Sequence, residues 1–272
     1  MAKIHPTAIV DSQAELAEDV TIGAYSIISG PVRIGARSII HPHSHVQGKT
    51  VIGSGCVIGP TAFVGLPPQH LRADPEIGQT IIGNRVIMRE TVSVHRSTSA
   101  GDDHATRVGN DCFLMGGAHV AHDCVLGDGV IAANGALLGG HCHIARKVFL
   151  GGGCTIHQFV RIGRLAMVGG NEPSSQDIPP FACFRYGGLK GYNAIGCKRD
   201  GWSQETIHAI RAAYRCLHSQ RVMSETVKMI RQTVPDLPEV RELLDFIATS
   251  KRGIVPSLSQ RNMSGRASGG DD

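Results

Sequence analysis

An apolar residue recurs at every sixth position through most of the N-terminal part of this chain. The series runs from Val10 to Val64, resumes from Ile82 to Ala100, and continues without a miss from Val108 to Val168. Helices repeat every 3.6 residues and strands every two, so neither explains a period of six. Such a period is typical of a β-solenoid, in which each hexad forms one short face and a few faces complete a coil around a continuous apolar core. We therefore expect an all-β solenoid of hexapeptide repeats.

The composition suits a solenoid and limits the functions of the chain. There are 34 glycines and only 4% aromatic residues, as expected where tight corners exclude a Cβ and the interior is too narrow for rings. The formal charge of +4 includes no run of Lys or Arg, so nucleic acid is not expected as a partner. Neither a secretory signal nor an apolar stretch of about 18 residues stands out, so we expect a cytoplasmic protein without an integral membrane segment.

Two interruptions and a change of period divide the chain. Residues 65–80 lose the apolar beat and carry three prolines, which predicts a projecting loop, whereas residues 101–105 predict a small bulge. We expect three parts in all, which are a β-helix over residues 1–187, a small C-terminal α-helical domain over 188–256, and a disordered tail over 257–272.

Helix signals support the second part. After Trp202 the apolar period becomes helical, and Ser203 can cap the helix that begins there. Asp236 and Glu239 have the spacing of a capping box ahead of the apolar run that starts at Val240. At least two helices should therefore close the chain.

The candidate chemistry lies in the last unbroken run of hexads, which contains His119, His122, His141, His143 and His157. Three hexads per coil give a turn of eighteen residues, and residues one turn apart stack about 4.8 Å apart, the spacing of hydrogen-bonded strands. On this arithmetic the stacked pairs are Asp123 with His141, Gly140 with His122, and His157 with Gly139. These side chains should converge on one ridge, beside two glycines.

An imidazole beside a carboxylate can act as a general base, because the carboxylate fixes the ring tautomer and stabilises the charged form. His122 and Asp123 form such a pair if the corner of the coil lets adjacent residues meet. Gly140 has no side chain, so its backbone N–H is accessible and could help to hold an oxyanion. Two alternatives stay open, because the histidines can also be polar residues on a solvated face or can ligate zinc together with a neighbouring subunit.

Six motifs at and around these residues carry a family resemblance. They are HRST (His95 to Thr98), AHVAHDC (Ala118 to Cys124), GGH (Gly139 to His141), IHQF (Ile156 to Phe159), MVGG (Met167 to Gly170) and QDIPP (Gln176 to Pro180). With them, and with AIRAAYR and TSKRGI in the helical part, almost the whole chain resembles the bacterial UDP-N-acetylglucosamine O-acyltransferases, which start lipid A synthesis. AHVAHDC is specific to this resemblance, whereas hexads are shared by many acyltransferases.

The resemblance implies a left-handed parallel β-helix that forms a homotrimer, with active sites in clefts between subunits. It implies that His122 is the general base, which removes a proton from the sugar 3-hydroxyl as this hydroxyl attacks the thioester of an acylated acyl carrier protein. Asp123 would orient the base, and the Gly140 N–H would stabilise the oxyanion. No metal or cofactor is implied.

The resemblance also implies how the substrates are held. Gly170 matches the position that sets the length of the acyl chain, where a small residue leaves a long slot. An acidic carrier protein could dock on the basic side chains of the terminal helices, although the same side chains are equally expected on an ordinary solvated helix surface. They are Arg211, Arg215, Arg221, Lys228 and Arg231. The residues that would line the substrate cleft are His119, His141, His157 and Gln158.

The chain departs from the family pattern in the projecting loop. The family usually has Gln-Asp-Leu-Lys-Tyr there, whereas this chain has the segment Gln69–Ala73, with His70 in place of the aspartate and Arg72 in place of the lysine. A carboxylate expected to bind sugar hydroxyls is therefore missing. Arg72 still offers a phosphate donor.

Further departures lie near the start of the helical domain. Asn193 and Arg199 match nucleotide-contacting positions, but Ile195 replaces an expected glutamate and Asp200 an expected arginine. Asp200 would repel a diphosphate unless it is turned away. The resemblance therefore implies UDP-N-acetylglucosamine as the acceptor, or a related UDP-sugar such as a 3-amino sugar that would be N-acylated. The sequence fixes neither acyl length nor 3-hydroxylation.

Two other functions fit parts of the pattern. A metal-dependent enzyme resembling the γ-class carbonic anhydrases would also be a trimeric β-helix with histidines between subunits. A non-catalytic scaffold that binds carrier protein would explain the departures as lost sugar binding. The helical domain and AHVAHDC favour the acyltransferase over the metal-dependent enzyme.

Overall fold

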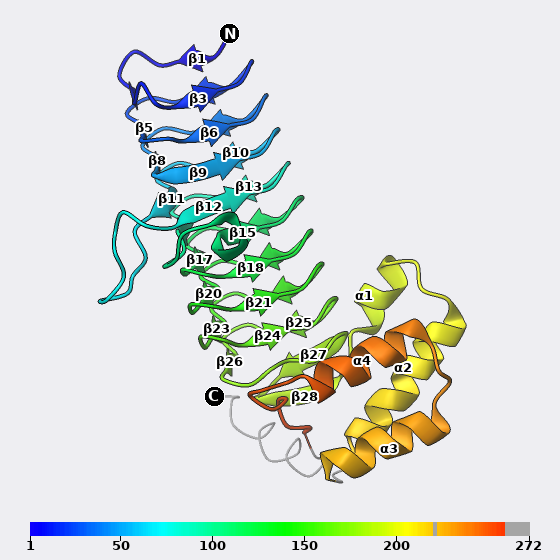
Figure 1. The fold of residues 1–272 in the computed structure, drawn as a ribbon. Helices are drawn as coiled ribbons and strands as arrows, with labels where there is room; N and C mark the ends of the chain where they lie inside the picture. The colour runs from blue at the N-terminus through cyan, green and yellow to red at the C-terminus, as the bar shows by residue number, and fades with distance from the viewer. Residues whose placement is uncertain (220–221, 259–272) are drawn as a thin grey trace, which may run out of the picture.

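The N-terminal part of the protein is a stack of coils, and each coil contributes short strands to three mainly parallel sheets (Figure 1). The structure is a computed structural model that describes residues 1–219 and 222–258. We name the sheets A, B and C in the order in which the chain visits them. One hexad therefore corresponds to one strand and one corner, as the period of six predicts.

The strands have the following bounds. Sheet A contains β1 (Lys3–Ile4), β4 (Thr21–Ile22), β7 (Ile39–Ile40), β10 (Val57–Ile58), β13 (Ile87–Met88), β16 (Phe113–Leu114), β19 (Ile131–Ala132), β22 (Phe149–Leu150), β25 (Met167–Val168), β27 (Ala182–Arg185) and β28 (Gly188–Tyr192). Sheet B contains β2 (Ile9–Val10), β5 (Ile27–Ser29), β8 (His45–Gln47), β11 (Phe63–Leu66), β14 (Ser93–His95), β17 (His119–Val120), β20 (Leu137–Leu138), β23 (Thr155–Ile156) and β26 (Pro173–Ser174). Sheet C contains β3 (Glu15–Leu16), β6 (Arg33–Ile34), β9 (Lys49–Ile52), β12 (Gln79–Ile82), β15 (Thr106–Val108), β18 (Val125–Leu126), β21 (His143–Ile144) and β24 (Arg161–Ile162).

The core is centred on a column of aliphatic side chains at the sixth positions, and smaller buried residues two positions earlier, such as Cys112 and Ala118, pack with it. The sixth-position residues from Ile22 to Val168 are buried, with the exception of Ala100. Ala100 is exposed because the second interruption begins at residue 96, earlier than the predicted bulge at 101–105, so its place in the six-residue series is a coincidence of counting. Each buried Val, Ile or Leu contributes about 1.5–3 kcal/mol, so the column accounts for much of the stability of the coil.

Both interruptions leave the coil at the same corner. Residues 67–78, which we call the long loop, join β11 of sheet B to β12 of sheet C, and residues 96–105, the short loop, join β14 to β15. The short loop contains the 3-10 turn η1 (Asp102–His104). Figure 1 shows the long loop projecting from the side of the stack. We call this edge, between sheets B and C, the histidine corner.

The register continues across both loops. Thr50 of β9 pairs with Thr80 of β12, and Thr80 pairs with Thr106 of β15, although these steps are longer than the ordinary step from Val120 to Leu138. The long and short loops are therefore additions to one corner and leave the stack of strands intact.

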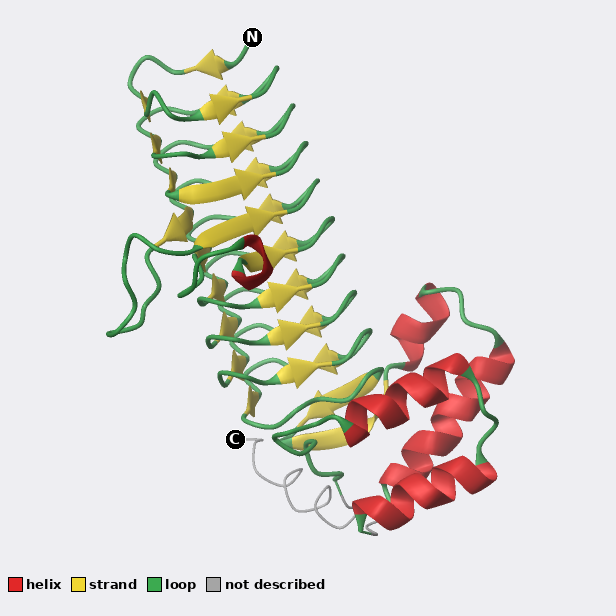
Figure 2. Cartoon of the chain, in the orientation of Figure 1, coloured by secondary structure: helices red, strands yellow, loops and turns green. Residues whose placement is uncertain are grey.

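Within the described residues, a hairpin and four helices close the end of the stack, where Figure 2 shows the helices gathered. β27 pairs parallel with β25 and antiparallel with β28, so the expected boundary between residues 187 and 188 falls inside this hairpin. Tyr214 donates a hydrogen bond to the Pro180 carbonyl and joins the helices to the coil. The tail expected over 257–272 lies outside the described residues from position 259 on. No helix in the described part of the chain is long and apolar enough to cross a membrane.

The helices are α1 (Ala194–Arg199), α2 (Gln204–Leu217), α3 (Met223–Thr233) and α4 (Pro238–Ala248). The cap at Ser203 is confirmed, because its hydroxyl accepts the Thr206 N–H at 3.1 Å. The capping box at Asp236 is wrong. Leu237 is the N-cap of α4 and Pro238 starts the helix, since proline needs no N–H partner there.

Candidate active site

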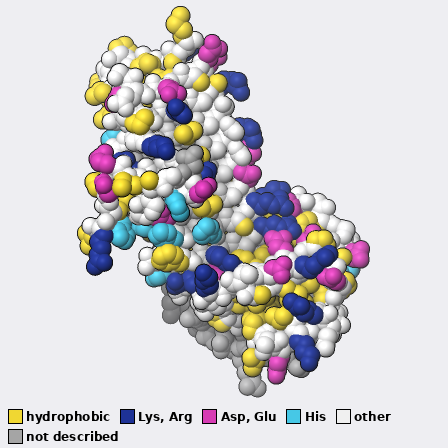
Figure 3. Space-filling model, viewed as in Figure 1, with side chains coloured by type: hydrophobic (Ala, Val, Ile, Leu, Met, Phe, Trp, Pro, Cys, Tyr) yellow, Lys and Arg dark blue, Asp and Glu magenta, His cyan; other side chains and the backbone are white. Residues whose placement is uncertain are grey.

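The ridge predicted from steps of eighteen lies at the histidine corner. His122 and Asp123 follow β17, His141 follows β20, and Phe159 follows β23, so they come from three successive coils. Asp123 has a φ of 61° and His141 a φ of 60°, and this left-handed turn brings adjacent side chains to the same side of the corner. Figure 3 shows histidine side chains gathered here, next to the long loop.

His122 and Asp123 form a buried pair. The Nδ1–H of His122 donates to Oδ2 of Asp123 at 2.7 Å, and the two side chains are only 9% and 10% exposed. A carboxylate can only accept here, so this bond places the ring proton on Nδ1 and leaves the lone pair on Nε2. Nε2 is therefore the atom of His122 that can take a proton from a substrate.

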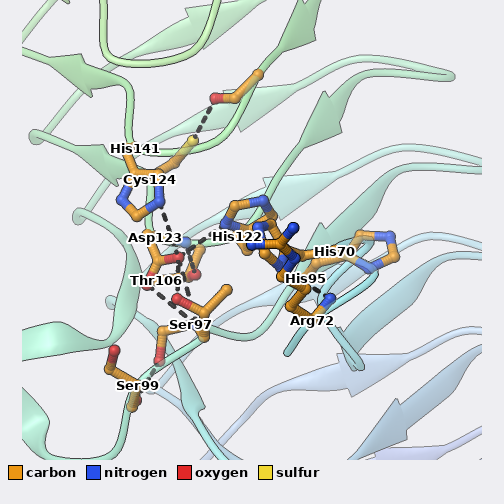
Figure 4. A network of polar contacts seen from close by, with 12 residues as sticks. His70, Arg72, His95, Ser97, Ser99, Thr106, His122, Asp123, Cys124 and His141 are labelled. Carbon is orange, nitrogen blue, oxygen red and sulfur yellow. Dashed lines mark hydrogen bonds and ion pairs between the residues drawn. The ribbon is translucent and has the colours of Figure 1, made fainter. Parts of the chain in front are cut away.

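Asp123 is the centre of the polar network in Figure 4, where contacts from His122 and His141 converge on its carboxylate. His141 Nε2 lies 3.5 Å from Oδ2. Thr98 donates its N–H to Oδ1 at 3.1 Å and its hydroxyl to Oδ2 at 2.9 Å. The N–H of Asp123 itself donates to the hydroxyl of Thr106 at 2.8 Å.

Gly140 lies against the His122 ring. A Cβ at this position would lie 2.5 Å from Cε1 of His122, so any other residue would displace the imidazole. No acceptor in the described part of the chain takes the Gly140 N–H. The glycine therefore makes room for His122 and also leaves a donor beside it.

Two further rings surround His122. The His141 ring makes an edge contact with it, with centroids 5.2 Å apart, and itself stacks on Phe159 at 4.5 Å. Burial lowers the pKa of His141, although Asp123 opposes this effect. From the long loop, His70 also makes an edge contact with His122 at 5.6 Å. Sequence reasoning missed Phe159, although its place one turn after His141 was a usable signal.

His119 and His95 form a second pair next to the first. The Nδ1–H of His95 donates to the Pro67 carbonyl at 2.6 Å, and Nδ1 of His119 lies 2.8 Å from the Ser93 hydroxyl. Burial, together with His95 and His122, lowers the pKa of His119 to about 4, and burial also lowers that of His95. Both imidazoles are thus neutral near pH 7. The repeat arithmetic does not identify His95 as a site residue, although the HRST motif contains it.

The ridge ends at His157 and Gln158, which are exposed. The guanidinium of Arg252 lies 3.3 Å from Nδ1 of His157, and its Nε donates to the Ser175 carbonyl at 2.8 Å. The segment after α4 therefore reaches back to the ridge. Arg252 belongs to the TSKRGI segment, to which no role was assigned.

Other predicted site residues lie elsewhere in this chain. Arg72 is exposed on the long loop, near His70 (Figure 4). Gly170 lies between β25 and β26, at the corner between sheets A and B, and Arg199 is exposed at the end of α1. Asn193 caps α1 through its side chain and donates to the Leu165 carbonyl at 2.8 Å. One chain therefore does not bring Gly170, Asn193 and Arg199 to the ridge, whereas the long loop places Arg72 beside His70.

Asp200 is turned away from solvent. It forms ion pairs with Lys147 and Arg164 and accepts the Trp202 indole N–H at 3.1 Å. Burial alone would raise the pKa of Asp200, but the hydrogen bonds from Lys147 and Trp202 outweigh it, and the pKa lies below its ordinary value. Its charge is thus neutralised within the protein. The neighbouring substitution, Ile195, is 65% exposed.

The ridge also contains a possible set of metal ligands. Ligand atoms of His122, Asp123 and His141 all lie within 4.8 Å of one another. Two imidazoles and a carboxylate suit zinc. The 2.7 Å hydrogen bond between His122 and Asp123 is equally compatible with acid–base chemistry without a metal.

A coil of hexapeptide repeats with a buried imidazole and carboxylate on one edge is the architecture of a hexapeptide-repeat transferase. Family models agree. One described as UDP N-acetylglucosamine O-acyltransferase, domain 2, matches residues 177–255, and one described as bacterial transferase hexapeptide (six repeats) matches residues 31–65 and 105–140.

Relatives extend this match to nearly the whole chain. The acyl-[acyl-carrier-protein]–UDP-N-acetylglucosamine O-acyltransferase of Syntrophobacter fumaroxidans is 42% identical over 257 residues, which are 93% of this chain and 99% of the relative. The enzyme of the same name from Sulfurihydrogenibium sp. is 44% identical over 266 residues, 97% of this chain and 98% of the relative. The solved structure of LpxA from Acinetobacter baumannii matches with a TM-score of 0.86 at 39% identity and covers 93% of this chain and 99% of that one. The chain belongs to the UDP-N-acetylglucosamine O-acyltransferase family, and it is an acyltransferase.

Proposed function

We propose that the protein transfers an acyl chain from acylated acyl carrier protein to the 3-hydroxyl of UDP-N-acetylglucosamine, the first step of lipid A synthesis, in the cytoplasm. The named relatives supply the reaction. The observation that carries the mechanism is the buried 2.7 Å hydrogen bond between His122 and Asp123, next to Gly140, whose N–H has no acceptor among residues 1–219 and 222–258.

His122 acts as the general base in this proposal. Its Nε2 takes the proton of the sugar 3-hydroxyl while the hydroxyl oxygen attacks the thioester carbonyl. Asp123 keeps the reactive tautomer in place and stabilises the imidazolium that forms. The tetrahedral intermediate carries a negative oxygen, and the Gly140 N–H is the donor for it.

The leaving group needs little help. When the intermediate collapses, the carbon–sulfur bond breaks and the thiol sulfur receives the proton that His122 holds. A thiol has a pKa of about 8.5, so its thiolate leaves more readily than an amine would. One base and one oxyanion donor are therefore sufficient.

We propose that the coil is a left-handed β-helix and that three copies associate through sheet A. The outward-facing residues of sheet A form an unbroken apolar column from Ile39 to Met167, and Ile39, Ile87 and Phe149 are each more than a third exposed in the single chain. Such a stripe needs a cover. A trimer would also explain why Gly170 and Asn193 lie away from the histidine corner, since each cleft would combine two subunits.

The acceptor is held by the cleft residues. His119, which is neutral, can hydrogen-bond to sugar hydroxyls, and His141, His157 and Gln158 extend the surface along the ridge. Arg72, Asn193 and Arg199 are the proposed contacts of the UDP part. Because Asp200 pairs with Lys147 and Arg164, its carboxylate does not stand free against a diphosphate. A 3-amino sugar in place of the 3-hydroxyl sugar is the alternative acceptor.

The donor is acidic, and its proposed docking surface is the helical domain. Arg211 and Arg215 of α2 and Lys228 and Arg231 of α3 are exposed, whereas Arg221 lies outside the described residues. Gly170 is the proposed limit of the acyl slot. A Cβ there would lie 3.3 Å from the Gly152 carbonyl oxygen, so a larger residue would fill this space.

The test is acyl transfer from a panel of 3-hydroxy and plain acyl carrier thioesters to UDP-N-acetylglucosamine and to its 3-amino analogue. We expect transfer to at least one acceptor, and a loss of kcat on the order of a thousandfold in His122→Ala. Full activity of His122→Ala would overturn the assignment of the base. A preference for chains of about ten carbons would contradict the role of Gly170, because a small residue at this position leaves a long slot.

The second candidate, a metal-dependent enzyme, is favoured only by the closeness of His122, Asp123 and His141. Metal analysis of the purified protein separates the two. We expect transferase activity that survives chelators. Stoichiometric zinc together with loss of activity on chelation would favour the second candidate.

A further inference from the structure

Asp123 occupies an unusual place in the coil. At the next two turns of the histidine corner, the second turn residue donates its N–H to a backbone carbonyl one coil earlier, as His141 does to His122 at 3.0 Å and Phe159 to Gly140 at 2.9 Å. Asp123 is the corresponding residue one coil after the short loop, and this loop replaces the turn whose carbonyl would have accepted the Asp123 N–H. Its partners must therefore come from the loop.

Two threonines, one in the short loop and one at its end, supply these partners. Thr106, which is fully buried, accepts the backbone N–H of Asp123 and so replaces the missing carbonyl. Thr98 donates both its N–H and its hydroxyl to the carboxylate. The hydroxyl bond, at 2.9 Å, goes to Oδ2, the same oxygen that accepts the His122 Nδ1–H.

The residues before Thr98 hold it in place. The N–H of Arg96 donates to the Leu66 carbonyl, and Ser97 exchanges two hydrogen bonds with Gln79, its N–H donating to the Gln79 carbonyl and its hydroxyl accepting the Gln79 N–H. Leu66 and Gln79 are the strand residues that flank the long loop on either side. The backbone just before Thr98 is thus held by hydrogen bonds to both strands that flank the long loop. These bonds fix the positions of the Thr98 N–H and hydroxyl.

We infer that Thr98 is a positioning residue for the acid–base pair. Its two donors stop the Asp123 carboxylate from rotating and keep Oδ2 directed at His122. This inference rests on the proposed function of His122 and Asp123 and extends it to the short loop. A hydrogen bond between a hydroxyl and a buried carboxylate is among the stronger ones in proteins, so its loss should be measurable.

The experiment compares Thr98→Val, which keeps the shape and the N–H but loses the hydroxyl, with Thr98→Ser, which keeps the hydroxyl. Thr80→Val is the matched control, because Thr80 lies one coil above Thr106 in sheet C and its buried hydroxyl has no partner within the described residues. We expect Thr98→Val to lower kcat about tenfold with KM unchanged. Thr98→Ser should restore kcat to within about twofold of wild type, and Thr80→Val should match wild type.

A double-mutant cycle tests whether Thr98 acts through Asp123. In an Asp123→Ala background, measured under single-turnover conditions, Thr98→Val should cause no further loss of rate. A further tenfold loss there, a change confined to KM, or a wild-type kcat for Thr98→Val would each overturn the inference.

His122→Ala in the same assay distinguishes a failure of the proposed function from a failure of the inference about Thr98. If His122→Ala retains full activity, the proposed base is wrong. If His122→Ala is inactive while Thr98→Val behaves as wild type, only the role of Thr98 fails. Thermal unfolding of each variant shows whether a loss of rate comes from loss of structure, and a folded Thr98→Val with reduced kcat supports the inference.

Discussion

The uninterrupted coils and the histidine corner are built from the same hexads, yet they use them differently. In the uninterrupted coils the strands pair through backbone groups one turn away, as Val120 pairs with Leu138. At the histidine corner the two loops break this rule, and side chains such as Thr98 and Thr106 replace backbone partners. Regular stacking thus sets the spacing of the proposed catalytic residues, and irregular segments set their orientation. Four predictions test this division.

The largest expected effect comes from a single methyl group at the corner. Gly140→Ala places a Cβ 2.5 Å from Cε1 of His122, so the ring must move away from its partner Asp123. We expect kcat to fall on the order of a hundredfold or more, with little change in the unfolding temperature.

The matched control is Gly116→Ala, where the nearest atom to the added Cβ is the flexible end of Glu90. This variant should keep wild-type kcat. Equal losses in both variants would mean that the coil, and not the His122 ring, is disturbed.

Removing the long loop tests whether the coil can fold without the segment that is proposed to contact the substrate. Excision of residues 67–78 joins Leu66 directly to Gln79. Leu66 and Gln79 are hydrogen-bonded to the consecutive residues Arg96 and Ser97, so the two cut ends lie side by side. The pairing of β9 with β12 should therefore stay unchanged. We expect a folded protein with a cooperative melt near that of wild type, but with kcat/KM reduced at least about a hundredfold because His70 and Arg72 are gone. Circular dichroism and the transfer assay measure the two effects. An unfolded product would show that the loop is needed by the stack.

A core substitution should have the opposite pattern. Ile58 is fully buried in sheet A, away from the histidine corner. Ile58→Ala should lower the free energy of unfolding by about 2–5 kcal/mol and Ile58→Val by about 0.5–1.5 kcal/mol, measured by urea unfolding. At temperatures where both stay folded, kcat should match wild type. A loss of kcat that grows with the loss of unfolding free energy would mean that the coil does more than set the spacing of the residues at the histidine corner.

The smallest expected effect is a pH dependence of stability. The pKa of His119 is lowered to about 4 from 6.5, so the unfolded chain takes up this proton at a higher pH than the folded chain does. Stability is therefore lost as the pH falls from about 6.5 towards 4, and this histidine contributes no slope above that window. His119→Asn should make the fall of the urea midpoint shallower in the window, whereas the exposed control His5→Asn should not. Identical slopes for His119→Asn and wild type would contradict the lowered pKa.

The fold was largely predictable because a period of six admits few structures and because stacking is local. Counting in steps of eighteen residues correctly placed His141 beside Asp123 and Gly140 beside His122, because no insertion interrupts the coil between these positions. This counting could not identify Thr98 or His70 as neighbours of Asp123 and His122. Both lie in loops, which have no sequence period and whose contacts depend on how the loop folds back onto the coil. The hairpin of β27 and β28 was missed for a related reason, since its antiparallel turn leaves the hexad rhythm.

The helix ends show the limits of local signals. Ser203 was recognised as a cap because the hydroxyl and the helix start are adjacent in sequence. Asp236 was misjudged because Pro238 competes for the start of the same helix, and the carboxylate instead lies 3.4 Å from Arg241. Asn193 was assigned to nucleotide contact, but its side chain caps α1, so any contact with the nucleotide has to leave this cap in place.

The resumption of register on both sides of each loop has a consequence for how such proteins can change. Since the strands above and below do not shift when the corner lengthens, the long loop and the short loop behave as separately replaceable inserts on an invariant frame. If the long loop contacts the acceptor as proposed, acceptor preference can therefore drift while the short loop keeps its support of the proposed catalytic pair. A library confined to residues 69–73 would explore new acceptors at little risk to folding.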